Sequence, residues 1–284
     1  MLLRDIHIRD PFIFLEDGKY YLYGTRGSEC WGKCSGLDVY VSEDLENWSE
    51  PIEIFSKPDG FWADRDYWAP EMHKYQGSYY LLVSFKSDDH CRGTQILKSD
   101  SPMGPFMLHS DGPVTPENWE CLDGTLYVEN GKPYMIFCHE WTQVGDGEIC
   151  AIELSQDLSK SVSEPVLLFR ASDSACVKSL TDKNAYVTDG PFLYQTQAGK
   201  LIMLWSSFSE EGYCEILSYA KEGTVTGAWE HDDRMLFQKD GGHGMVMRDS
   251  RNRLWYIAHT PNQTPYERPV LMEIEERDNS LFVK

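Results

Sequence analysis

One short pattern occurs five times along this chain of 284 residues. In the first copy, residues 8–16 run from a polar start into an apolar stretch, a turn follows at Asp17-Gly18, and residues 20–23 form a second aromatic stretch. Two such stretches joined by an Asp-Gly turn are typical of a β-hairpin. The pattern therefore predicts that each copy contributes at least two antiparallel strands.

The five copies are spread through the whole sequence. When one equivalent residue is taken from each copy, the successive intervals are about 54 to 66 residues, which suits repeats of several short strands. The residues taken as equivalent are Asp10, Ala69, Asp123, Asp189 and His243. Repeats of this kind are typical of a β-propeller, in which four-stranded blades surround a central channel. We therefore predict an all-β fold, a five-bladed β-propeller with four-stranded antiparallel blades, formed by residues 1–284 as a single domain.

A propeller would bring residues together that are distant in the sequence. Each equivalent residue would open the innermost strand of its blade, so the five side chains would meet at one axial cavity. The carboxylates of Asp10, Asp123 and Asp189 and the imidazole of His243 would lie there. A half-buried carboxylate is costly unless it is paired or used in chemistry, so three of them in register indicate a functional site.

Paired carboxylates are typical of glycoside hydrolysis. One ionised group activates water, a protonated partner donates to the leaving oxygen, and a third charge can raise the pKa of that partner. A separation of about 6.5–9.5 Å between the working carboxyl groups gives inversion at the anomeric carbon, and about 5–5.5 Å gives retention. Because opposing blades face each other across a channel, we expect the wider separation and inversion.

Aromatic residues make up 13% of the chain. This content suits a carbohydrate site, where flat sugar faces stack on rings, although packing between blades would account for most of these residues. Trp31, Trp62 and Trp68 are the candidates for a stacking platform, because they lie in a long loop or beside charged residues. Arg268 is a candidate for binding a sugar hydroxyl, and a surface ion pair is its alternative role.

The charge balance narrows the choice of partners. The chain has 26 basic and 46 acidic residues, a net charge of −20, which repels phosphate backbones and anionic lipids. We therefore expect an oligosaccharide partner, no nucleic acid and no membrane. No apolar run approaches the ~18 residues of a membrane span. The first residues lead into the first repeat without a signal segment, so we expect a cytoplasmic protein with reduced cysteines.

The five motifs together resemble the inner-strand motifs of glycoside hydrolase family 43, in order and in spacing. They are Arg9-Asp10-Pro11-Phe12, Trp68-Ala69-Pro70-Glu71, Leu122-Asp123-Gly124, Asp189-Gly190-Pro191 and Gly242-His243-Gly244. The resemblance covers all five repeats. It implies a five-bladed propeller and inverting hydrolysis of α-L-arabinofuranosyl or β-D-xylosyl linkages in oligosaccharides, for which we expect action at chain ends.

The resemblance also implies roles for single residues. Asp10 falls on the general base of the family, and Asp123 on the aspartate that tunes the pKa of the acid and orients the substrate. His243 falls on the histidine beneath the pocket that helps to hold a structural calcium or sodium ion near the propeller axis. No organic cofactor is expected.

The fourth motif departs from the family at the general acid. The family usually has a glutamate there, in a Glu-Gly-Pro motif, whereas this chain has Asp189. Aspartate is one methylene shorter, and a misplacement of about 1 Å can cost around 10²-fold in rate. We predict that Asp189 is nevertheless the acid. The alternative donors are Glu71, Glu120 and Glu140.

Two other functions remain open at this point. The first is a propeller that binds sugar without cleaving it, because Asp189 stands where glutamate is expected. The second is a retaining fructoside hydrolase, since Arg9-Asp10-Pro11 and Trp119-Glu120-Cys121 resemble motifs of that family. Those motifs occur here in the first and third repeats, and the Asn-Asp-Pro-Asn nucleophile motif of that family is missing. The sequence leaves the sugar, the ion and the oligomeric state open.

Overall fold

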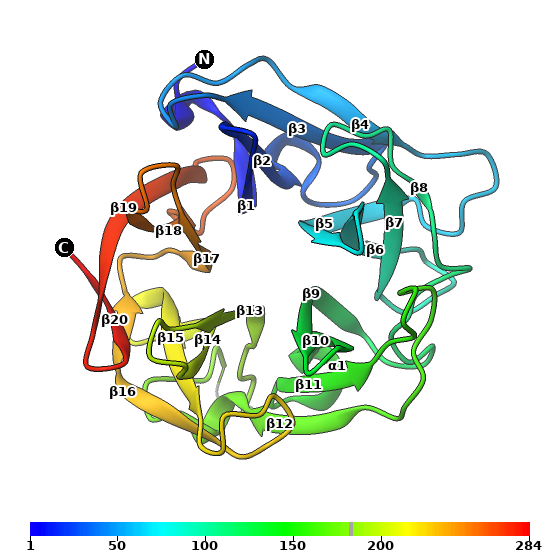
Figure 1. Cartoon of the computed structure of the whole chain (residues 1–284). Helices are drawn as coiled ribbons and strands as arrows, with labels where there is room; N and C mark the ends of the chain where they lie inside the picture. The colour runs from blue at the N-terminus through cyan, green and yellow to red at the C-terminus, as the bar shows by residue number, and fades with distance from the viewer. Residues whose placement is uncertain (182–183) are drawn as a thin grey trace.

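Five four-stranded sheets stand around a common axis in the computed structural model, which describes residues 1–181 and 184–284 (Figure 1). The strands of each sheet are antiparallel and follow one another in chain order, from the axis outward. The predicted fold, a five-bladed β-propeller with four-stranded blades, is confirmed.

Residues 1–181 and 184–284 form twenty strands in these blades. Blade 1 contains β1 (Ile8–Glu16), β2 (Lys19–Arg26), β3 (Gly36–Ser42) and β4 (Ile52–Ser56). Blade 2 contains β5 (Arg65–Tyr75), β6 (Ser78–Lys86), β7 (Gly93–Ser99) and β8 (Met107–Leu108). Blade 3 contains β9 (Cys121–Glu129), β10 (Lys132–His139), β11 (Glu148–Glu153) and β12 (Val166–Arg170). Blade 4 contains β13 (Asp189–Gln195), β14 (Leu201–Ser209), β15 (Gly212–Ala220) and β16 (Trp229–Phe237). Blade 5 contains β17 (Gly242–Arg248), β18 (Leu254–Thr260), β19 (Arg268–Arg277) and β20 (Ser280–Val283).

In the described part of the chain, helical structure is confined to four short segments. They are η1 (Leu3–Asp5), η2 (Gly27–Glu29), α1 (Trp141–Val144) and η3 (Ala171–Asp173). Within the described residues, the structure has no helix with the length and hydropathy needed to cross a membrane.

The turn between the first two strands follows the sequence pattern. In blade 1, Asp17 and Gly18 have φ values of 49° and 76°. Two consecutive residues in the left-handed region form the type of turn whose twist matches that of the flanking strands. The pairs Gln76-Gly77 and Asn130-Gly131 repeat this conformation in blades 2 and 3. These turns fix the register of the inner hairpins, and therefore the position of every residue at their open ends.

Each inner strand begins with a β-bulge, which sets the side chains that face the axis. In every blade one residue of the bulge has a left-handed φ, between 46° and 57°, and the strand register shifts beside it. These residues are Asp10, Ala69, Asp123, Gly190 and His243. Bulges of this kind often re-aim side chains next to active sites.

The bulges correct one detail of the predicted alignment. In blade 4 the left-handed residue is Gly190, so Asp189 occupies the position of Arg9 in blade 1. The prediction that three carboxylates are in register was therefore wrong in blade 4. The alignment followed the acidic side chain, whereas the backbone register follows the residue with positive φ, which glycine adopts without strain.

Side chains of blades 1 and 5 join the two ends of the ring. Arg9 donates from Nη1 to Glu267 Oε1 (2.8 Å) and from Nη2 to Asn262 Oδ1 (2.6 Å). The side chain of Glu267 is fully buried. Thr264 Oγ1 also donates to Glu267 Oε1 (2.6 Å). The ring is thus closed by a buried ion pair between the first and last blades.

We expect the change Glu267→Ala to lower the free energy of unfolding by about 3–5 kcal/mol, because it leaves the cation of Arg9 without its buried partner. Urea unfolding followed by far-UV circular dichroism measures this change. The matched control is Glu275→Ala, which removes an exposed ion pair with Arg277 (3.4 Å) and should change stability by about 0–1 kcal/mol. Equal effects of the two changes would contradict the role of Glu267 in closing the ring.

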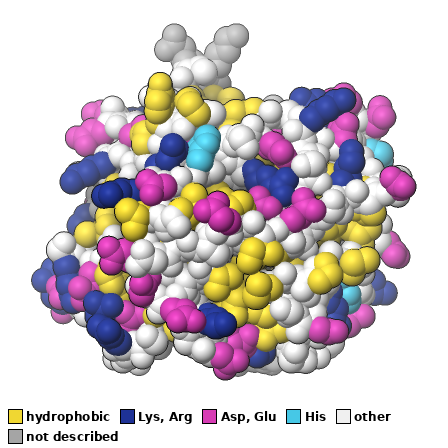
Figure 2. Space-filling model, turned by 90° about the horizontal axis from the view of Figure 1, so that it is seen from above, with side chains coloured by type: hydrophobic (Ala, Val, Ile, Leu, Met, Phe, Trp, Pro, Cys, Tyr) yellow, Lys and Arg dark blue, Asp and Glu magenta, His cyan; other side chains and the backbone are white. Residues whose placement is uncertain are grey.

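Charges of both signs are interspersed on the side of the ring that carries blade 1. Figure 2 shows lysine and arginine side chains among aspartate and glutamate side chains on this side, around a group of hydrophobic ones. The basic side chains on this side do not gather into the stripe that a nucleic-acid backbone would need. All eight cysteines are free.

Candidate active site

A cavity of about 400 Å³ lies on the propeller axis, at the face where the inner strands begin. Its lining includes side chains from the first strands of all five blades. Among them are Arg9, Asp10, Trp68, Asp123, Asp189 and His243. The structure therefore brings together the three aspartates and the histidine that the sequence placed at the axis.

Asp10 is held by a hydrogen bond within its own blade and by an ion pair with a histidine of blade 5. Thr25 Oγ1 donates to Asp10 Oδ2 (2.6 Å), and His243 Nδ1 lies 3.2 Å from Asp10 Oδ1. Burial acts to raise the pKa of Asp10, but the charges of His243 and Arg9 hold it below its ordinary value. Asp10 is therefore an ionised carboxylate that can accept a proton.

Polar side chains from the second strands fix the bulges of the neighbouring blades. In four of the five cases a side chain near the end of a second strand accepts a hydrogen bond from the backbone N–H of the next left-handed residue. The pairs are Thr25 with Ala69 (2.8 Å), Ser84 with Asp123 (2.8 Å), Ser206 with His243 (2.7 Å) and His259 with Asp10 (3.2 Å). In the fifth case Gly190 N–H donates to Asp123 Oδ2 (2.9 Å). Each blade therefore positions the axial residue of the next.

His259 was missed by the sequence reasoning. Its Nδ1 accepts from Asp10 N–H, and its Nε2 lies 3.2 Å from Asn262 Oδ1, to which it can donate. Burial lowers the pKa of His259 to about 4, so the ring is neutral and supports the backbone of Asp10. The available signal was the polar residue that recurs near the end of each second strand.

The pKa values of Asp189 and Asp123 are shifted in the opposite direction to that of Asp10. Burial raises the pKa of Asp123 to about 7 and that of Asp189 to about 6. Tyr213 Oη donates to Asp189 Oδ2 (3.0 Å), and Gly190 N–H ties Asp123 to the peptide that follows Asp189. Tyr213 is buried and was also missed by the sequence reasoning. The cavity thus contains an ionised carboxylate and two carboxyl groups that hold their protons to higher pH.

His243 lies between the carboxylates. Burial acts to lower its pKa, but Asp10 and Asp123 raise the pKa more strongly, to about 9. Its Nε2 is buried and has no hydrogen-bond partner in the described part of the chain. That nitrogen could bind a hydrated cation, since Nδ1 is held by a carboxylate as in many metal-binding histidines. Among residues 1–181 and 184–284 no group of three or more His, Cys, Asp or Glu could hold a metal ion, so water would supply the other ligands.

Two of the predicted tryptophans form one wall of the cavity. Trp31 and Trp68 meet edge to face, with ring centroids 5.2 Å apart, and both line the cavity. Trp31 Nε1 donates to Thr264 Oγ1 (2.9 Å), and Trp68 Nε1 donates to the Cys30 carbonyl (2.5 Å). Trp31 is 59% exposed, which leaves its ring available for a sugar.

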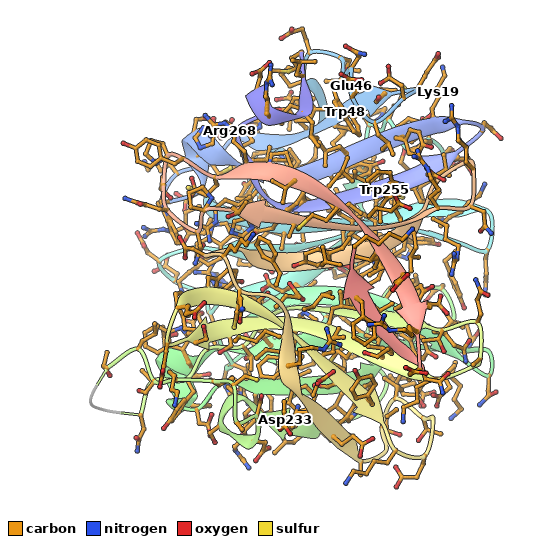
Figure 3. The ribbon with its side chains drawn as sticks, turned by 90° about the vertical axis from the view of Figure 1, so that its left-hand side faces the viewer. Lys19, Glu46, Trp48, Asp233, Trp255 and Arg268 are labelled. Atoms are coloured by element: carbon orange, nitrogen blue, oxygen red, sulfur yellow. The ribbon has the colours of Figure 1, made fainter. Side chains whose placement is uncertain are left out.

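Trp62 and Arg268 do not line the axial cavity, so the structure does not bring these two predicted residues to it. Trp62 packs against Phe61 and Phe85 and borders a separate cavity, because the aromatic contacts of the β4–β5 connection turn it away from the axis. Arg268 Nη1 donates to the carbonyls of Pro265 and Glu267 (3.1 and 2.6 Å). Figure 3 shows Arg268 at the edge of the ring, at the opposite end of the strands from Lys19.

Of the three alternative proton donors, Glu140 alone lines the axial cavity. Its Oε2 lies 3.4 Å from Arg92 Nε. Glu71 instead pairs with His73 Nε2 (3.2 Å). Glu120 accepts from Lys86 Nζ (2.6 and 2.7 Å) and from Arg92 N–H (2.8 Å). Asp189 and Glu140 therefore remain the two candidates for the acid.

Comparison with known proteins agrees with this geometry. The family model for glycosyl hydrolases family 43 matches residues 5–276. The crystal structure of an endo-arabinase from Bacteroides thetaiotaomicron VPI-5482 is 38% identical in sequence, with a TM-score of 0.91 and 98% of both chains covered. An α-L-arabinofuranosidase from Lactobacillus brevis is 18% identical, with a TM-score of 0.79 over 100% of this chain and 97% of its own, which shows a shared fold.

A curated relative gives a shorter match. The extracellular endo-α-(1→5)-L-arabinanase 1 of Bacillus subtilis (strain 168) is 26% identical over 148 residues, which cover 48% of this chain and 45% of the relative. The match therefore spans less than half the length of that relative.

Proposed function

Since the chain belongs to glycosyl hydrolases family 43, we propose that it hydrolyses glycosidic bonds of arabinan or xylan. The observation that carries the proposal is a cavity with an ionised carboxylate, Asp10, and a carboxyl group with a raised pKa, Asp189. This combination supplies a base and an acid to one glycosidic bond. Arabinan is the preferred substrate class, because the structure 38% identical to this chain is described as an endo-arabinase. Action at chain ends stays a prediction.

In the proposed mechanism Asp10 is the general base. Its carboxylate removes a proton from a water molecule as the water oxygen forms a bond to the anomeric carbon. The bond between that carbon and the leaving oxygen breaks at the same time. Thr25 and His243 hold the carboxylate of Asp10 in place, so little rearrangement is needed when the charge is transferred.

Asp189 is the general acid and gives its proton to the leaving oxygen. Tyr213 orients its carboxyl group, and burial keeps that group protonated to higher pH. Asp123 fixes the peptide between Asp189 and Gly190 through its hydrogen bond to Gly190 N–H. After the reaction Asp10 carries one proton more and Asp189 one fewer, and exchange with solvent restores both.

His243 Nε2 would hold a hydrated calcium or sodium ion, which would supply positive charge beneath the carboxylates. Such binding requires the neutral ring, so the cation would displace the proton that the carboxylates otherwise keep on His243. The ring also keeps Asp10 oriented through Nδ1.

The test is to incubate the protein with linear α-1,5-arabino-oligosaccharides and xylo-oligosaccharides and to follow the first-formed anomer by proton NMR. The proposal expects shortened chains whose new reducing end has the inverted configuration. A retained configuration would overturn inversion. Binding without any product would favour the second candidate, a sugar-binding propeller, for which the specific observation is an aspartate where the family usually has glutamate. The family match disfavours the fructoside hydrolase alternative.

The shifted pKa values predict the pH dependence. Catalysis needs Asp10 ionised and Asp189 protonated, so kcat/KM should fall when pH drops through the lowered pKa of Asp10. It should also fall, up to about tenfold per pH unit, as pH rises through about 6 to about 7, where Asp189 and Asp123 lose protons. A profile of kcat/KM from pH 3 to pH 9 measures the alkaline limb and shows how far activity persists toward acid pH. A rate that still rises above pH 8 would contradict Asp189 as the acid.

A further inference from the structure

A second cavity of about 320 Å³ opens beside the axial one. Its walls come from three connections: the one before β5, which carries Trp62, the β6–β7 loop, which carries His90 and Arg92, and the segment between β8 and β9, which carries Gly112. Since neighbouring strands are antiparallel, the start of β5, the end of β6, the start of β7, the end of β8 and the start of β9 lie at the same edge of the propeller. The second cavity therefore opens on the same face as the candidate active site.

Arg92 separates the two cavities. Its side chain lines the second cavity and is 5% exposed. Its guanidinium carbon lies 3.6 Å from the ring centroid of Trp68, and its Nε lies 3.4 Å from Glu140 Oε2. Trp68 and Glu140 both line the axial cavity. The two cavities are thus divided by about the thickness of one side chain.

The lining of the second cavity suits a neutral sugar. The indole of Trp62 is half-buried and lies against the imidazole of His90, with ring centroids 5.7 Å apart, which provides an aromatic surface for a sugar face. Arg92 Nη1 has no hydrogen-bond partner among the residues that the structure describes, so this buried donor is free to bind an oxygen of a ligand. The exposed carboxylates of Asp111 and Glu117 at the rim can accept hydrogen bonds from hydroxyls and repel anionic ligands.

The wall of this cavity is closely packed on one side and open on the other. A Cβ at Gly93 would come within 2.6 Å of Pro113 Cβ, whereas a Cβ at Gly112 would meet no atom within 4 Å. Side chains therefore bound the cavity closely at Gly93, whereas a side chain can be added at Gly112 without a clash.

We propose that the second cavity is a further carbohydrate-binding site, which holds a distal sugar of the same pentose chain whose scissile bond lies in the axial cavity. The inference rests on the proposed function for the identity of the chain. Binding at two adjacent sites on one face lets a long chain gain affinity that a short one lacks. The site would favour long substrates over fragments.

The test compares wild type with Gly112→Phe, which adds an aromatic ring to a residue that lines the second cavity, without removing a side chain. KM is measured on linear α-1,5-arabino-oligosaccharides of two to six units and on an aryl α-L-arabinofuranoside. In wild type KM should fall as the chain lengthens. In Gly112→Phe, KM for the hexamer should rise about threefold to tenfold, the effect of losing one aromatic contact, while kinetics on the aryl substrate stay unchanged.

Two further variants keep the result interpretable. Glu164→Phe places the same side chain at an exposed position outside the cavities described above and should behave as wild type. His90→Ala removes part of the aromatic surface at an exposed residue, and a KM for the hexamer that rises there too supports the site. An unchanged KM for the hexamer in both Gly112→Phe and His90→Ala overturns it. If wild type cleaves none of these substrates, the proposed function fails. Calorimetric titration of the hexamer into wild type and Gly112→Phe then tests the second site independently of cleavage.

Discussion

Asp10→Asn should lower kcat on α-1,5-arabino-oligosaccharides by about 10²–10⁴-fold, the usual contribution of a general base. The amide cannot take the proton of the attacking water, whereas its size and its tolerance of a left-handed φ match those of aspartate. Thr25 can still donate to the amide oxygen, so the site should keep its shape. Steady-state kinetics on the purified variant measure the loss, and KM should change little.

The control for this variant is Asp17→Asn. Asp17 also has a left-handed φ, of 49°, but it lies exposed in the β1–β2 turn at the other end of strand β1. The same chemical change there should leave kcat within about twofold of wild type, as expected for a surface substitution. Full activity of Asp10→Asn would remove Asp10 from the mechanism.

Asp189→Asn should lower kcat by about 10²–10⁴-fold on oligosaccharides, since the leaving sugar oxygen would depart without a proton. On an aryl α-L-arabinofuranoside with an acidic phenol as leaving group, the loss should be much smaller, because that phenolate needs little protonation. The ratio of the two losses separates an acid role from general damage to the site. Circular dichroism and the unfolding midpoint of the variant serve as checks on the fold.

The matching variant is Glu140→Gln, since Glu140 is the other candidate acid that lines the cavity. If Asp189 is the donor, Glu140→Gln should lose activity to a similar degree on both kinds of substrate. A strong dependence on the leaving group in Glu140→Gln, with none in Asp189→Asn, would reverse the assignment.

Most of the fold could be predicted from the repeated sequence pattern. The hairpin turns, the number of blades and the convergence of Asp10, Asp123 and His243 all follow from residue spacing, because a turn with two left-handed residues has few sequence solutions. The register of blade 4 did not follow, since the acidic Asp189 hid the equivalence of Gly190. A residue's φ is a property of the backbone that its side-chain charge does not reveal.

The missed residues share a different cause. Tyr213 and His259 act through hydrogen bonds to Asp189 and Asp10, residues 24 and 249 positions away in the sequence. The His259 contact depends on how blades 5 and 1 pack, and the Tyr213 contact joins the third strand of blade 4 to the start of its first strand. Hairpin patterns specify neither kind of packing. Trp62 was misplaced for the same reason, because packing against its aromatic neighbours decided which cavity it borders.

The hydrogen bonds between successive blades have a consequence for how such a protein can change over evolutionary time. Four of the five second strands set the backbone of the neighbouring axial residue, so duplication, loss or exchange of a single blade would leave an adjacent axial residue without its support. The complete five-bladed ring is therefore the smallest part of the chain that can be inherited with its activity intact. The fourth strands, which take no part in these bonds and do not line the axial cavity, are where sequence variation can accumulate without loss of chemistry.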